Sequence, residues 1–219
     1  MRFLILIAII AAAGAAQSRK LPPDIDPQSF SRLPLLQRNQ LSGEALKTFD
    51  AVAGKDANSK ERATPPLGPV ATSLYSPGVA EPMNKLNLYL RNTVVGPAMF
   101  QICALIAARE FNENYEWTAH EAGAKRAMVD AKTVAAIRFN RGLEGLPDKD
   151  ALVIRFGRGL LREHAVSPEL YAQVVEVFGR QGMFELTSVI ADYAMAAIML
   201  RAVDQHVPNS TSELPRIAR

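Results

Sequence analysis

Residues 98–111, AMFQICALIAAREF, form a nearly continuous apolar stretch in the middle of the chain. Pro97 precedes the stretch, and proline is favoured in the first turn of a helix because the N–H that it lacks has no intrahelical partner there. A helix that is apolar on almost every side must be surrounded by other elements. We therefore expect a long helix after Pro97 to lie at the centre of the core.

Apolar residues at helical spacing and residues that cap or stop helices predict the other elements. In residues 82–91, Met83, Leu86 and Leu90 repeat at intervals of three and four and should form a buried face. Further helices are expected between Ser42 and Gly54, at 115–126, at 131–139 after the cap Asp130, at 149–164, from Ser167-Pro168-Glu169 to about Gly182, and at 183–205. Little of the chain alternates like a half-buried strand, so the predicted fold class is all-α, with about six to eight helices.

The N-terminus has the pattern of an export signal. Arg2 precedes an apolar run from Phe3 to Ala13, and small residues follow before Gln17. A run of about 11 residues is short of the roughly 20 that a membrane-spanning helix needs. We expect cleavage after Ala16, export to the periplasm or the medium, and no stable membrane span.

Four segments follow from these boundaries. They are a signal peptide at 1–16, an N-terminal arm with a short helix and a proline-rich loop at 17–73, a helical domain at 74–207, and a polar, frayed tail at 208–219.

Charge and cysteine content exclude some functions. The net charge is only +3, and basic and acidic residues are interspersed, so no nucleic-acid partner is expected. Cys103 is the single cysteine, which excludes an intramolecular disulfide, and its apolar neighbours indicate a small buried side chain.

The most informative stretch for chemistry is NENYEWTAHE, residues 112–121. On one helix Glu116 and His120 are neighbours, and Glu113 lies one turn earlier on the same side. A carboxylate can orient an imidazole that exchanges protons near neutral pH. The alternative is an ordinary solvated Glu–His pair, against which the adjacent aromatic residues Tyr115 and Trp117 argue.

The string ALIAAREFNENYEWTAHEAGAKRA, with YEW-x-x-H at its centre, resembles carboxymuconolactone decarboxylases and the related alkylhydroperoxidase D-like proteins. The resemblance covers roughly residues 74–207. It implies an alkylhydroperoxidase D-like helical bundle that assembles as a homo-oligomer, a trimer or hexamer. The decarboxylase of this group is a lyase of aromatic catabolism that converts 4-carboxymuconolactone to 3-oxoadipate enol-lactone.

This chain departs from the patterns of that group at several positions. The cysteine pair of the peroxidase branch falls on Glu113 and Glu116, so no disulfide cycle can operate. A glutamate usual in related sequences is replaced by Gln101, whose amide does not titrate. Gly159 stands where an acid is frequent.

The resemblance makes His120 and Glu116 the expected catalytic residues. Its implied substrate-binding residues are Gln101, Arg109, Tyr115, Trp117 and Glu113. Arg109 can pair with a substrate carboxylate through its fork of N–H donors, as can Arg138 or Arg141, although such arginines more often form salt bridges.

Three functions remain open at this point. The first is lactone decarboxylation or related proton transfer on a carboxylated cyclic small molecule, and the second is a non-catalytic binding protein of the same fold. The third is a peroxidase-related activity without a dithiol. No cofactor is expected, and the histidine spacing does not match a metal site.

Overall fold

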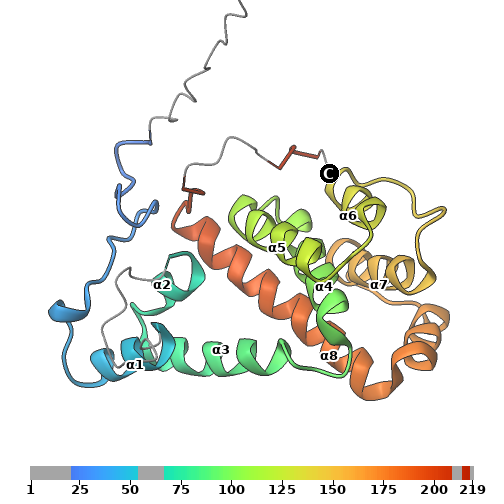
Figure 1. The fold of residues 1–219 in the computed structure, drawn as a ribbon, viewed down its shortest axis with the longest axis horizontal. Helices are drawn as coiled ribbons and strands as arrows, with labels where there is room; N and C mark the ends of the chain where they lie inside the picture. The colour runs from blue at the N-terminus through green and yellow to red at the C-terminus, as the bar shows by residue number, and fades with distance from the viewer. Residues whose placement is uncertain (1–20, 54–66, 209–213, 218–219) are drawn as a thin grey trace, which may run out of the picture.

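The computed structural model describes residues 21–53, 67–208 and 214–217 (Figure 1). Apart from one isolated bridge, all regular structure in these ranges is helical, which confirms the all-α fold class. The predicted signal peptide lies outside the described residues. The eight α-helices of the described ranges are α1 (Gly43–Ala53), α2 (Pro69–Ser73), α3 (Pro77–Leu90), α4 (Gly96–Glu110), α5 (Asn114–Arg126), α6 (Ala131–Arg138), α7 (Asp148–Arg158) and α8 (Pro168–Ala202).

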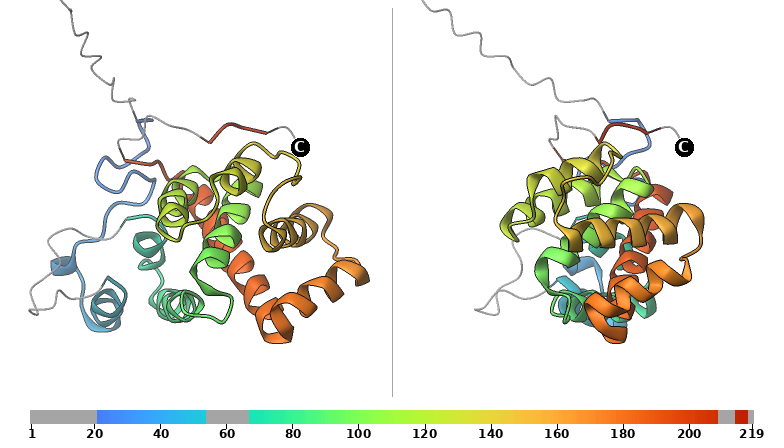
Figure 2. Two further views of the ribbon diagram at one scale, coloured as in Figure 1. Left: turned by 45° about the vertical axis from the view of Figure 1, so that its right-hand side comes forward. Right: turned by 90° about the vertical axis from the view of Figure 1, so that its right-hand side faces the viewer.

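Helix α4 forms the centre of the molecule, as its apolar sequence predicts. It packs against α5, α7 and α8, and every residue from Ile102 to Glu110 is buried. Pro97 occupies its first turn. Figure 2 shows α5, α6 and α7 close to α4, and its left view shows α1 set apart beside α3.

Helix α8 is two helices joined at a bend. Gly179 has φ 69° and ψ 172°, which is outside the helical region and costs glycine little because it has no Cβ. Figure 1 shows the short first limb and the long second limb that result. Two helices with a break at about Gly182 were expected, and the break falls three residues earlier. Ser167 caps the first limb by accepting from the N–H of Leu170, as predicted.

Helix α3 differs from the prediction in its start and in its burial. It begins at Pro77, and Pro82 lies inside it. Leu90 is buried, but Leu86 is 42% exposed, so the expected buried face is wrong for that residue. Helix α3 packs against α1, α2 and α8, and these contacts leave Leu86, Leu88 and Tyr89 exposed.

The chain after α7 continues into a π-helical turn, Gly159–Glu163, which ends at His164 with a left-handed φ of 54°. A Cβ on Gly159 would lie 2.8 Å from the carbonyl oxygen of Ala165. Glycine is therefore required for this close approach, which explains why no acid stands at position 159.

The arm and the tail both contact the helical core. The N–H of Arg32 donates to the carbonyl of Val203 at the end of α8, and the N–H of His206 donates to the carbonyl of Phe30. In the tail, Leu214 is buried in the core cluster, so the expectation of a frayed tail is wrong for that residue. Helix α2 lies within the predicted arm and was not expected, because five residues are too few to display a helical period.

By length and composition alone, α8 is apolar enough to cross a membrane. Half of its most apolar window is buried inside the molecule, and the core helix of a soluble protein passes the same test.

Candidate functional site

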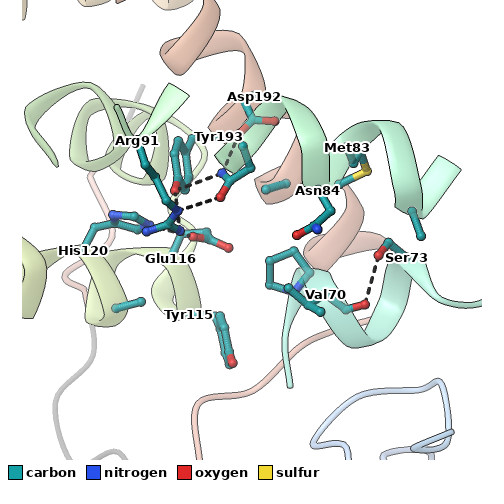
Figure 3. A pocket seen from close by; sticks show the side chains of 15 residues that line it. Val70, Ser73, Met83, Asn84, Arg91, Tyr115, Glu116, His120, Asp192 and Tyr193 are labelled. Carbon is teal, nitrogen blue, oxygen red and sulfur yellow. Dashed lines mark hydrogen bonds and ion pairs between the residues drawn. The ribbon is translucent and has the colours of Figure 1, made fainter. Parts of the chain in front are cut away.

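A cavity of about 200 Å³ lies between α2, α3, α5 and α8 (Figure 3). Each of the four helices contributes side chains to it, so the site is assembled from segments that are far apart in the sequence. The lining residues are Pro69, Val70 and Ser73 of α2, Ala80, Met83, Asn84 and Asn87 of α3, Arg91 that follows α3, Tyr115, Glu116, Ala119 and His120 of α5, and Asp192, Tyr193 and Ala196 of α8.

His120 lies on the wall of this cavity and is 6% exposed. Its Nδ1 is 2.7 Å from Oε1 of Gln101, and its Nε2 is 3.3 Å from Oε2 of Glu116. Because an amide oxygen only accepts hydrogen bonds, this arrangement assigns a proton to Nδ1. Nε2 is then the nitrogen that can exchange a proton with the cavity.

Glu116 is almost fully buried beside His120. Its backbone N–H donates to Oε2 of Glu113 over 2.6 Å, so Glu113 caps α5 and fixes the start of the helix that carries the pair. Within the described ranges, Oε1 of Glu116 has no hydrogen-bond partner. A buried carboxylate oxygen without a partner is costly, and such groups gather at functional sites.

Gln101 reaches His120 from α4 because α5 has no side chain at Gly123. A Cβ at position 123 would lie 2.5 Å from Oε1 and 2.7 Å from Cδ of Gln101. Gln101 therefore stands behind His120 and does not line the cavity. The prediction that Gln101 contacts a substrate is wrong, because its side chain contacts the imidazole of His120 instead.

A polar cluster from α3 and α8 lies beside His120. The amide of Asn87 donates to Oδ2 of Asp192 over 2.8 Å and to the hydroxyl of Tyr193 over 3.3 Å. Arg91 donates from Nε to Oδ1 of Asn87 over 2.8 Å, and its Nη2 is 3.5 Å from the Tyr193 hydroxyl. The ring of Tyr193 meets the ring of His120 edge-on, with centroids 4.4 Å apart.

Burial sets the protonation of several of these groups. Burial raises the pKa of the Tyr115 phenol to about 12 and also raises the pKa of Tyr193. The same desolvation raises the pKa of the Asp192 carboxyl, against the amide of Asn87, which lowers it. Both phenols are therefore neutral donors at neutral pH.

Besides Gln101, three more residues predicted to bind a substrate lie outside the cavity. Trp117 is 1% exposed and belongs to the core, where its large apolar ring is buried. Glu113 is the cap of α5. Arg109 is buried and donates to the carbonyl of Arg138 and to the side chain of Asn112, so it holds the loops that follow α4 and α6. Of the residues predicted to bind a substrate, Tyr115 is the one that lines the cavity.

The lining residues missed at the sequence level include the whole polar cluster of Asn87, Arg91, Asp192 and Tyr193. Asn87 and Asp192 are 105 positions apart, and no spacing rule connects two helices across such a distance. A weaker indication was available, because Asp192 interrupts an otherwise apolar stretch of the long helix and a buried charge on a core helix needs a reason.

Cys103 is fully buried in α4, and burial raises the pKa of its thiol. A protonated, inaccessible thiol is a poor nucleophile, in accordance with its predicted structural role. Among the described residues, no group of three or more His, Cys, Asp or Glu side chains is arranged to hold a metal ion.

No protein-family model matches the chain, and no curated protein matches it.

Proposed function

We propose that the chain is a carboxymuconolactone decarboxylase-like enzyme that catalyses decarboxylation, or a related proton transfer, on a small carboxylated cyclic substrate such as a lactone. The observation that carries the proposal is the buried His120, held by Gln101 on one side and Glu116 on the other, at the wall of a cavity. An imidazole fixed in this way meets the geometric requirement for a general acid or base.

The size and lining of the cavity support a small substrate. A volume of about 200 Å³ is below the range of drug-sized pockets and suits a single ring with short substituents. Val70, Met83, Ala80 and Ala196 supply apolar surface for such a ring. Among the described residues, Arg91 is the arginine that lines the cavity, and Arg109, Arg138 and Arg141 do not line it. Arg91 therefore takes the role of binding a substrate carboxylate.

In the proposed step, the bond between the ring carbon and its carboxylate breaks and carbon dioxide leaves. The electron pair remains on the conjugated ring, and His120 delivers a proton from Nε2 to carbon. Glu116, 3.3 Å from that nitrogen, orients the imidazole of His120. After the proton has moved to carbon, Glu116 relays a proton from solvent to Nε2. The partly apolar cavity assists because a carboxylate loses its charge as it leaves.

The second candidate is a non-catalytic binding protein with the same cavity. Gln101 favours it, because the amide leaves the Nδ1 side of His120 without a group that titrates. A ligand that binds the cavity and releases no carbon dioxide would support this alternative.

The test is a screen of carboxylated cyclic lactones by thermal shift and by release of carbon dioxide. Ala119 lines the cavity, and Ala122 is exposed on the same helix and lies outside it, so Ala119→Trp and Ala122→Trp are a matched pair. We expect wild type and Ala122→Trp to bind and turn over the same lactone, and Ala119→Trp to do neither. Turnover that survives Ala119→Trp would place the reaction elsewhere.

A further inference from the structure

The proposed reaction creates a negative charge on the substrate, and no residue has yet been assigned to stabilise it. When the bond to the leaving carboxylate breaks, its electron pair moves into the conjugated carbonyl of the ring, and the carbonyl oxygen becomes negative. A hydrogen-bond donor aimed at such an oxygen typically contributes about a hundredfold to a thousandfold in rate. The cavity wall must therefore offer a donor that is not already committed.

Several donors on the wall are committed to protein groups. The hydroxyl of Ser73 donates to the carbonyl of Val70, and the amide of Asn87 donates to Asp192 and Tyr193. The Nε–H of Arg91 donates to Asn87. Asn84, Tyr115 and Tyr193 also line the cavity with donor groups, and Tyr193 is the one whose ring contacts the ring of His120.

Both acceptor positions of the Tyr193 hydroxyl are directed at donors. Its oxygen receives the Asn87 amide at 3.3 Å and faces Nη2 of Arg91 at 3.5 Å. A phenol oxygen has room for about two such donors, so its own hydrogen must point elsewhere. In the described part of the chain, no acceptor receives that hydrogen, and Tyr193 lines the cavity. Figure 3 shows its oxygen beside Arg91, on the wall shared with His120 and Glu116.

The ring of Tyr193 is also held in place. It meets His120 edge-on with centroids 4.4 Å apart and Phe100 edge-on with centroids 5.6 Å apart. Burial keeps the phenol protonated by raising its pKa, and the cationic Arg91 polarises the O–H bond. A donor fixed before the reaction needs little rearrangement as charge develops.

We propose that Tyr193 is a catalytic residue that donates its O–H hydrogen bond to the substrate oxygen on which negative charge develops, with Asn87 and Arg91 fixing the direction of that bond. Tyr193 keeps its proton throughout, while His120 supplies the proton that reaches carbon. The substrate class narrows accordingly to rings in which the carbon that bears the departing carboxylate lies next to a carbonyl, or next to a double bond conjugated with a carbonyl. This inference rests on the proposed function.

The test uses Tyr193→Phe, which keeps both ring contacts and removes only the hydroxyl. The expected result is a fall in kcat of about a hundredfold to a thousandfold with KM changed by no more than about threefold, because the lost bond forms mainly in the transition state. Tyr171→Phe, on an exposed residue of the same helix, is the control and should match wild type. Wild-type kcat in folded Tyr193→Phe would overturn the assignment.

A second readout does not depend on lactone turnover. Bound 4-nitrophenolate carries a negative oxygen, and a hydrogen bond to that oxygen moves its visible absorption to shorter wavelength. We expect this shift with wild type and its loss with Tyr193→Phe, or with Asn87→Leu if the first variant does not fold. An equal shift in wild type and variants would overturn the role of Tyr193. If the shift depends on Tyr193 but the protein turns over no lactone, the proposed function is wrong, and Tyr193 is still the hydrogen-bond donor in the cavity.

Discussion

Nδ1 of His120 lies 2.7 Å from Oε1 of Gln101, across the contact between α5 and α4. The two residues are 19 positions apart and meet because the chain reverses direction after Phe111, where Asn112 has a left-handed φ of 50°. In this contact the amide holds the imidazole but can neither accept nor return a proton.

Gln101→Glu should therefore raise lactone turnover. A carboxylate at this position would accept the same hydrogen bond from Nδ1 and add a group that titrates. The expected gain is on the order of a hundredfold, against some loss of stability from burying a charge. Steady-state turnover of both proteins measures it, and a folded variant with unchanged turnover would show that this position is not a proton relay.

Gly123→Ala should weaken turnover without unfolding the protein. The new Cβ would lie 2.5 Å from Oε1 of Gln101, so the end of this flexible side chain must move away from His120. Alanine in a helix is otherwise favoured over glycine by about 1 kcal/mol. Gly78→Ala, with no atom near its new Cβ, is the control. A loss of turnover in both variants, or in neither, would contradict the positioning role of Gln101.

Glu113→Gln should stabilise the fold at high pH. Burial, with a smaller contribution from Glu116, raises the pKa of Glu113 from 4.5 to about 7, while the N–H of Glu116 lowers it. The native protein then binds this proton more tightly than the unfolded chain, so stability is reduced above pH 7 and recovers as the pH falls toward 4.5. Glutamine keeps an oxygen for the N–H of Glu116 and carries no charge.

The expected gain for Glu113→Gln is on the order of 1 to 3 kcal/mol at pH 8 and close to zero at pH 4.5. Denaturant unfolding of the two proteins at both pH values measures the difference. A gain of equal size at the two pH values would contradict the charge as its cause.

The chain should form a homo-oligomer. Large apolar side chains lie exposed near the junction of α3 and α8, where Tyr89 bonds to Glu185: Leu88, Tyr89, Val94 and Phe184 are each more than half exposed. Apolar surface of this kind marks a contact between proteins. Light scattering at micromolar concentration should report a trimer or hexamer, and Phe184→Glu should reduce its mass. A monomer at every concentration would contradict the expectation.

Local patterns in the sequence were enough to predict most of the helices. Pro97 and the apolar run after it define α4, Asp130 caps α6 by accepting from the N–H of Lys132, and Ser167 caps α8. Each of these features depends on neighbours within about four positions, which a sequence displays directly. The burial of α3 was mispredicted because burial depends on how many helices surround an element.

One half of the candidate site was predictable and the other was not. Glu116 and His120 are one turn apart on a single helix, so their spacing brings them together. Asn87 and Tyr193 belong to helices that meet only in the folded chain. Arg109 was expected at the site as a cation for a carboxylate, but its position on the buried face of α4 directs it to Asn112 and the carbonyl of Arg138.

The central claim is that His120 transfers a proton in the cavity, and a pH profile of lactone turnover with wild type and His120→Gln tests it most directly. Glutamine can still bond to Glu116 but does not titrate. We predict that wild type shows an ionisation in kcat/KM that the variant lacks, with turnover in the variant lower by about a hundredfold or more. Equal rates and the same pH profile in two folded proteins would contradict the role of His120.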